Sequence, residues 1–272
     1  MNHRKPLSLL AALVCALTLV PTAAALEKPL TQSQSDLTAE GTLPAGCAES
    51  TLGDFLCDAA LEAVGADVAI LPAGVMTGTL EKGAVFQSDL ERVIPTDAPL
   101  VTAQLTAADL AALLEQGVSR LTRNESEQID MENSAWDGFP QTGGITWEYD
   151  VSAPTGERLQ YICLNDEELD LSDTAQTYTV TSTAALFDGS LGYAVRSVEE
   201  TDMTLRQAAH DYCAARDSVS APSTRATAIG TASYPIAAKF PVLAIAAAGI
   251  LIALIASIPK WKEKKHFSFE GK

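Results

Sequence analysis

The sequence predicts an α+β layered domain, in which a mixed β-sheet is flanked by helices, together with one transmembrane helix. Helical and extended patterns alternate over residues 49–216, which is typical of layered domains built from both kinds of element. Each end of the 272-residue chain instead carries an apolar run next to basic residues. We therefore expect one compact domain between an export signal and a membrane anchor.

Residues 1–25 have the three parts of a secretory signal peptide. Arg4 and Lys5 precede an apolar run that begins at Leu7, and the segment ends in an Ala-x-Ala at Ala25. The run is short for a bilayer core about 30 Å thick, so a cleaved signal is favoured over an uncleaved anchor helix. Residues 26–48 are then a lead-in to the domain.

A second apolar run, residues 240–258, is free of charge and long enough to span a membrane. Lysines and Trp261 follow it at once, which places residues 259–272 in the cytoplasm by the positive-inside rule. A buried core helix is the alternative interpretation of this run. Residues 217–239 are rich in Ser, Thr and Ala and predict a flexible stalk. The sequence thus predicts a single-pass protein of the cell membrane, with its domain outside.

The elements of the domain follow from caps, turns and apolar spacing. Ser50 can cap a first helix that Gly65 ends, and Thr106 can cap another that ends near Gly117. Ser88 can cap a short helix that stops before Pro95. Further elements are strands over residues 67–71, 100–105, 145–149, 159–164 and 178–182, and a last helix over 203–216. Polar residues 120–141 show no period and are expected to form a surface loop.

Charge and residue content exclude several kinds of chemistry. The chain has 35 acidic and 18 basic residues, and a net charge of −17 disfavours binding to the negatively charged backbone of nucleic acid. Between the two ends His210 is the only histidine, so neither a His-rich metal centre nor a Ser-His-Asp triad is expected. The acidic residues of 166–173 lack the spacing of a calcium loop and suit a solvated hairpin. We expect no cofactor and no metal site.

Four cysteines remain once the signal is removed: Cys47, Cys57, Cys163 and Cys213. An even number in an exported domain suggests two disulfides, with three pairings that the sequence cannot separate. Free thiols are the alternative, because Cys213 falls on an apolar helix face where an inert buried thiol is common.

Several short motifs occur in a fixed order along the chain. They are residues 50–55 (Ser-Thr-Leu-Gly-Asp-Phe), 66–70, 80–83, 93–95, 144–150 (Gly-Ile-Thr-Trp-Glu-Tyr-Asp) and 189–193 (Gly-Ser-Leu-Gly-Tyr). This set resembles the C-terminal domain of the 5′-nucleotidase family of exported nucleotide and nucleotide-sugar hydrolases. The resemblance implies an α+β fold and a link to nucleotide catabolism. In that family a separate N-terminal metallophosphoesterase domain holds two metal ions, and we do not expect it here.

The resemblance also identifies the positions that would contact substrate: Gly74, Thr77, Thr96, Ala98, Ala185, Phe187 and Leu191. The family binds phosphate through an arginine at the position of Thr77, and it holds the base between two rings at the positions of Thr96 and Ala185. Phe187 could replace the second ring. Since a hydroxyl cannot replace a bidentate guanidinium on phosphate, the resemblance implies a degenerate pocket.

Two hypotheses follow for the function. The first is a non-catalytic surface module that binds a nucleotide, another small ligand or a surface protein. The second is an accessory substrate-binding domain that works in trans with a metallophosphoesterase in nucleotide hydrolysis. Arginine placement separates them, because an anion site could be rebuilt if Arg92, Arg120, Arg123 or Arg196 converged on the loop of residues 74–77.

Overall fold

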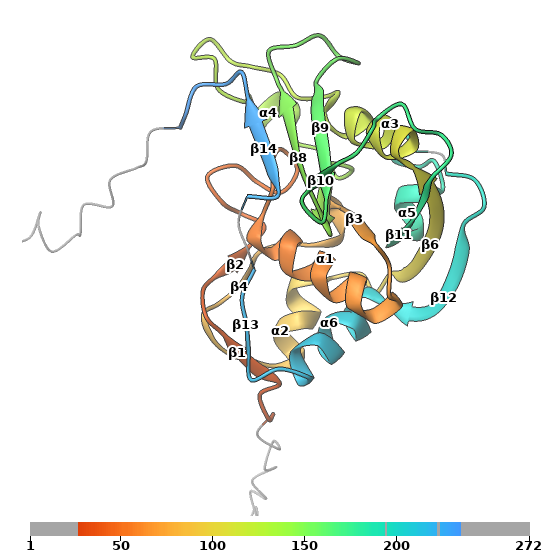
Figure 1. Ribbon diagram of the computed structural model, residues 1–272. Helices are drawn as coiled ribbons and strands as arrows, with labels where there is room; N and C mark the ends of the chain where they lie inside the picture. Colours follow the sequence, from red (N-terminus) through yellow and green to blue (C-terminus); the bar gives the residue numbers. More distant parts are fainter. Residues whose placement is uncertain (1–26, 194, 222–223, 235–272) are drawn as a thin grey trace, which may run out of the picture. The chain divides into compact units, whose positions relative to one another are not determined.

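The computed structural model describes residues 27–193, 195–221 and 224–234 (Figure 1). The chain divides into two compact units, Met1–Ala232 and Ser233–Lys272, and every element below belongs to the first. The predicted signal peptide (1–25), transmembrane helix (240–258) and cytoplasmic tail (259–272) lie outside the described residues. Within those described, no helix is both long and apolar enough to cross a membrane.

A five-stranded mixed sheet lies at the centre of the first unit, with the strand order β12-β6-β11-β3-β7. Its strands are β3 (Val68–Pro72), β6 (Pro99–Thr106), β7 (Pro140–Gly143), β11 (Thr177–Thr183) and β12 (Glu199–Thr204). β3 and β11 are parallel, and the other pairings are antiparallel. All five residues of β3 are buried, as expected for a central strand covered on both faces. The predicted α+β fold with a mixed sheet and flanking helices is confirmed.

Helix α1 (Thr51–Val64) packs on β3 and β7 and lies beside α6 (Leu205–Ala214) (Figure 1). It begins where predicted, because the Ser50 hydroxyl accepts a hydrogen bond from the backbone N–H of Gly53. It ends at Gly65, whose φ of 65° lies in the left-handed region that favours glycine. Phe55 of α1 meets Tyr212 of α6 edge to face, with ring centroids 5.8 Å apart.

Helix α3 (Ala107–Val118) packs against β6 and against β9 of a second sheet. Thr106 caps it, and the Asp109 carboxylate reaches back to the backbone N–H of Thr106. The second sheet has the order β10-β9-β8-β14. Its strands are β8 (Ile145–Asp150), β9 (Leu159–Leu164), β10 (Glu167–Glu168) and β14 (Ala226–Ile229).

The remaining elements are short. They are β1 (Thr31–Ser33), β2 (Leu37–Thr38), η1 (Ala73–Val75), β4 (Thr79–Leu80), β5 (Gly83–Val85), α2 (Gln87–Val93), α4 (Met131–Ser134), α5 (Ala184–Phe187) and β13 (Ser218–Val219). β1 pairs with β5 and β13, and β2 pairs with β4.

The structure corrects the predicted domain limits on both sides. β1 and β2 fall in the predicted lead-in, so residues 31–38 are part of the domain. β13 and β14 fall in the predicted stalk, where β14 pairs in parallel with β8. Arg225 fastens this segment, since its guanidinium bonds both carboxylate oxygens of Asp58 at 2.8 and 2.9 Å. Strands of two to four residues carry too little apolar period to be found from sequence.

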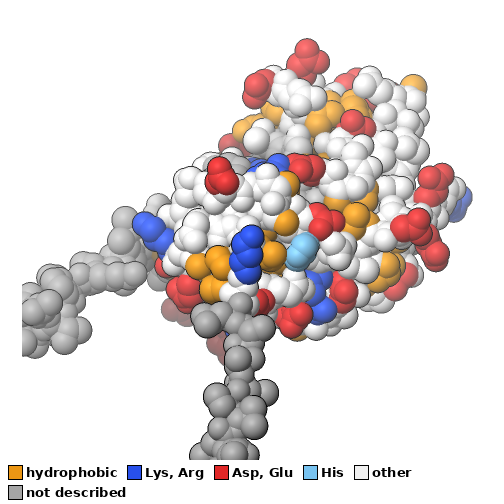
Figure 2. Space-filling model, turned by 90° about the horizontal axis from the view of Figure 1, so that it is seen from below, with side chains coloured by type: hydrophobic (Ala, Val, Ile, Leu, Met, Phe, Trp, Pro, Cys, Tyr) orange, Lys and Arg blue, Asp and Glu red, His pale blue; other side chains and the backbone are white. Residues whose placement is uncertain are grey.

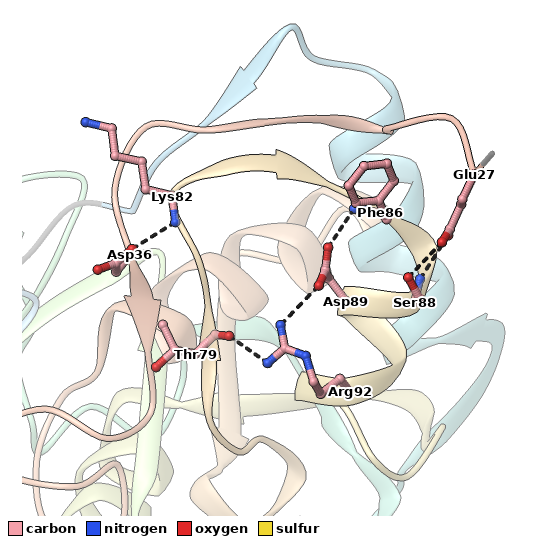
Figure 3. Close-up of polar contacts among 8 residues, drawn as sticks. All are labelled: Glu27, Asp36, Thr79, Lys82, Phe86, Ser88, Asp89 and Arg92. Carbon is pink, nitrogen blue, oxygen red and sulfur yellow. Dashed lines mark hydrogen bonds and ion pairs between the residues drawn. The ribbon is translucent and has the colours of Figure 1, made fainter.

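Two smaller expectations also differ. Helix α2 begins at Gln87, and the Asp89 carboxylate in its first turn accepts a hydrogen bond from the backbone N–H of Phe86. Ser88 lies inside the helix and donates its hydroxyl proton to Glu27 (Figure 3). The loop expected over residues 120–141 contains helix α4 and the start of β7.

The predicted disulfides are wrong, because Cys47, Cys57, Cys163 and Cys213 are all free thiols. Three of them are buried and Cys163 is half-buried. The Cys57 thiol donates to the carbonyl of Gln141 at 3.3 Å, which directs it at β7 rather than at another cysteine. Burial, with a smaller contribution from Asp130, raises the pKa of the Cys47 thiol to about 11. Cys47, Cys57 and Cys213 act as small apolar core residues, and free thiols are the alternative that the sequence had left open.

Candidate functional site

The topology brings the substrate-loop positions to one edge of the central sheet. Since β3 and β11 are parallel, the loops that follow Pro72 and Thr183 leave at the same edge. β6 and β7 run the other way and begin there, with Leu100 opposite Thr183 and Pro140 opposite Pro72. Ligand sites of open sheets form where strand ends and loops meet in this way.

A hollow of about 410 Å³ lies at this edge. Its lining residues come from the N-terminal segment, the loop after β3, the loop after α2 and the segment before β7: Ala39, Glu40, Pro44, Ala45, Gly46, Ala73, Gly74, Met76, Thr77, Pro95, Ala135, Trp136 and Asp137. Of the seven predicted positions, Gly74 and Thr77 line it. Thr77 is exposed, and its backbone N–H donates to the carbonyl of Val93 at 3.0 Å.

Gly74 has a packing role that explains its retention. Its backbone N–H donates to the carbonyl of Asp137 at 2.8 Å, so the two loops are in direct contact. A Cβ atom at position 74 would lie 2.7 Å from the Cβ of Asp137, closer than packed carbon atoms allow. The glycine therefore permits this approach, and its presence says nothing about phosphate binding.

The other five predicted positions do not line the hollow. Thr96 and Ala185 are exposed, whereas Ala98 and Leu191 are half-buried. Phe187 is only 3% exposed and belongs to the hydrophobic core, so its ring is not available to stack on a base. The loop that contains Thr96 and Ala98 is held by Arg206, which donates to the carbonyl of Ile94 at 2.9 Å and lies 3.8 Å from Asp97.

Sequence reasoning missed Trp136 and Asp137. The Trp136 ring stacks on Tyr193 with centroids 6.0 Å apart, and the Arg120 guanidinium lies 4.2 Å from its centroid. The indole N–H donates to the carbonyl of Gly117 at 3.3 Å. Two aromatic residues around Gly138, in an otherwise polar stretch, were the signal that this loop is packed rather than solvated.

The charges that line the hollow are negative. Glu40 and Asp137 are both exposed, and neither lysine nor arginine is among the lining residues. Acidic side chains are also spread over the face of the molecule drawn in Figure 2.

None of the four arginines that could have rebuilt an anion site is among the residues that line the hollow. Arg92 donates to the carbonyl of Thr79 at 2.8 Å and pairs with Asp89 at 3.1 Å (Figure 3). Arg120 stacks on Trp136, and Arg123 donates to the carbonyl of Gly230 at 3.1 Å. Arg196 lines a different cavity. Across the ranges that the structure describes, no three His, Cys, Asp or Glu side chains are grouped so as to hold a metal ion.

Comparison with known proteins agrees with the fold. A family model described as the 5′-nucleotidase C-terminal domain matches residues 30–197. The trifunctional nucleotide phosphoesterase YfkN of Bacillus subtilis is 29% identical over 153 residues, which are 54% of this chain and 10% of that protein. The chain therefore spans only a small part of that relative.

Solved structures agree on the fold alone, because sequence identity is low. The 5′-nucleotidase precursor of Thermus thermophilus superimposes with a TM-score of 0.63 at 23% identity, over 76% of this chain and 40% of that one. The NAD nucleotidase of Haemophilus influenzae gives 0.61 at 15% identity, over 74% and 38%. Since the family model covers more than half of the sequence, this protein belongs to the 5′-nucleotidase C-terminal domain family.

Proposed function

We propose that this protein is a membrane-anchored, extracytoplasmic module of the family, non-catalytic and with a degenerate substrate pocket, that binds a small ligand or a protein at the cell surface. One observation carries the proposal. The hollow at the family's phosphate-binding loop has Thr77 in place of arginine and is lined by the carboxylates of Glu40 and Asp137.

The balance of charges disfavours a nucleotide at this position. Losing a charge-assisted hydrogen bond to phosphate removes about 1.5–3 kcal/mol of binding free energy. Two unit charges of the same sign about 6 Å apart repel by roughly 3 kcal/mol at an effective dielectric constant of about 20. A phosphate in this hollow would lack the charge-assisted hydrogen bond and would be repelled by the carboxylates, so a neutral or cationic group fits better.

The alternative, an accessory domain for nucleotide hydrolysis in trans, depended on an arginine at this loop. None of Arg92, Arg120, Arg123 and Arg196 lines the hollow, although Arg92 bonds the Thr79 carbonyl and Arg120 stacks on Trp136 beside it. The accessory role therefore has no support from the geometry, and we favour the surface module.

A rebuilding experiment tests the proposal. Thr77→Arg combined with Asp137→Asn should bind AMP at least about 10-fold more tightly than the matched pair Thr77→Gln with Asp137→Asn, because only the first restores a guanidinium. Isothermal titration of both proteins measures this ratio. Equal affinities would show that the missing arginine is not what disables the pocket.

The membrane anchor is proposed from the apolar run of residues 240–258 and the lysines behind it. An epitope tag after Lys272 should stay protected when intact cells are treated with protease, while the domain is digested. Digestion of the tag under the same conditions would contradict the proposed orientation.

A further inference from the structure

A second cavity lies between helix α3 and the chain that follows α5. Its volume is about 630 Å³, within the range of roughly 300–1,000 Å³ that is usual for small-molecule sites. It is lined by Gln104, Leu105, Asp109, Ala112, Leu113, Gln116, Gly192, Tyr193, Val195 and Arg196. We refer to it as the α3 groove.

The floor of the α3 groove is apolar. Leu105, Leu113 and Tyr193 are each no more than 6% exposed. The lining residues of α3 recur at helical spacing and so form one face of the helix, on which Ala112 leaves space that a larger side chain would fill. Such a floor accepts the apolar body of a ligand and leaves its polar end at the rim.

The rim carries one guanidinium that has no partner among the described residues. Within those ranges Arg196 has neither an ion pair nor a hydrogen bond, whereas Arg92, Arg206, Arg216 and Arg225 each pair with a carboxylate. An arginine left unpaired in so acidic a chain is available for an anion from outside.

The other polar groups of the rim limit the charge of that anion. The Asp109 carboxylate is already bound, since it accepts from the backbone N–H and the hydroxyl of Thr106 at 2.9 and 2.7 Å. It still adds a negative charge to the rim, so a single anionic charge is better tolerated than the two of a phosphate.

We propose that the α3 groove binds a small organic carboxylate, with its carboxylate on Arg196 and its apolar part on Leu105 and Leu113. The α3 groove shares no lining residue with the hollow at Gly74, although Tyr193 of the groove stacks on Trp136 of the hollow. Its occupant differs from a nucleotide in having one negative charge and no phosphate.

Paired probes test the proposal on the purified full-length protein. Benzoate and benzamide have nearly the same shape and differ in charge, and their binding can be followed by saturation-transfer NMR. Benzoate should bind at least about 10-fold more tightly than benzamide, the ratio expected for one charge-assisted contact. Arg196→Gln should remove that difference.

Arg123→Gln is the matched control, because Arg123 is also exposed and its guanidinium donates to the carbonyl of Gly230, away from the α3 groove lining. This variant should keep the preference for benzoate. Equal binding of benzoate and benzamide, no binding of benzoate up to about 10 mM, or the same loss in both variants would overturn the proposal. Inorganic phosphate that competes as well as benzoate would overturn the choice of a carboxylate.

Discussion

Asp54 is a buried carboxyl group whose protonation should control the stability of the domain. It lies in the first turn of α1 with no solvent exposure, and neither of its carboxylate oxygens accepts a hydrogen bond within the described part of the chain. Burial is the main reason that its pKa rises from 3.8 to about 8, and the nearby Glu49 carboxylate adds to the rise. The Arg225 guanidinium acts in the opposite direction, while the charge of Asp58 raises the pKa further.

The sign of the effect follows from proton binding. The folded protein keeps the Asp54 proton up to about pH 8, whereas the unfolded chain loses it near pH 4. The stabilising contribution of the protonated group is therefore fully present below pH 4. It falls steadily between pH 4 and 8 and is lost above about pH 8. Asp54→Asn removes this dependence, because the amide is neutral at every pH and keeps an N–H donor beside Glu49.

The magnitude can be bounded. One pKa unit corresponds to 1.36 kcal/mol, so the difference between 3.8 and about 8 sets an upper limit of roughly 5–6 kcal/mol. Relaxation and water penetration lower the cost of a buried charge, and we expect Asp54→Asn to be more stable by about 2 kcal/mol at pH 8.5. This corresponds to a rise of about 4–8 °C in Tm for a domain of this size.

Thermal unfolding of the two proteins between pH 4 and 9 measures the effect. The difference in Tm should be smallest at pH 4 and should grow until about pH 8. A difference that is constant over this range, or a variant less stable than the wild type at pH 8.5, would refute the assignment of a buried, protonated Asp54.

Three further predictions concern packing and pairing. Arg225→Gln should lower the free energy of unfolding, measured in urea, by about 3 kcal/mol, because it leaves the half-buried Asp58 carboxylate unpaired. The matched change Arg92→Gln, at an exposed ion pair, should lower it by less than about 1 kcal/mol. Equal losses in the two variants would contradict the role given to Arg225. Gly74→Ala should destabilise by about 1–3 kcal/mol through the contact with Asp137, and an unchanged urea midpoint would show that the two loops are not in contact. In the folded domain a thiol reagent at pH 8 should modify Cys163 much faster than the buried Cys47, Cys57 and Cys213. Peptide mapping measures the four rates. Equal rates, or a peptide pair joined by a disulfide, would contradict the conclusion that these three cysteines are buried free thiols.

The strong local signals of the sequence predicted the main elements correctly. Ser50 and Gly65 bound α1, and Thr106 caps α3, because a cap is a local interaction between a side chain and the next few N–H groups. By contrast, five of the six residues of β12 (199–204) are polar, and the strand forms by pairing with β6. Such a strand depends on a partner distant in sequence, so local pattern cannot reveal it.

The candidate site was predictable only in part. The resemblance named loops that the topology brings to one edge of the sheet, but of the seven positions only Gly74 and Thr77 line the hollow. Trp136 and Asp137 also line the hollow at that edge, and they lie in a stretch whose apolar residues show no regular period. Phe187, considered as a base-stacking ring, is instead a core residue, since a ring in a loop motif can face either way.

Calorimetric titration of the wild-type protein with AMP, with and without divalent metal, tests the central claim most directly. The lining of the hollow at Gly74 and Thr77 predicts no binding up to millimolar concentrations, under conditions in which a nucleotide-binding relative gives a clear signal. Binding at micromolar concentration would contradict the claim that this pocket has lost its affinity for nucleotides.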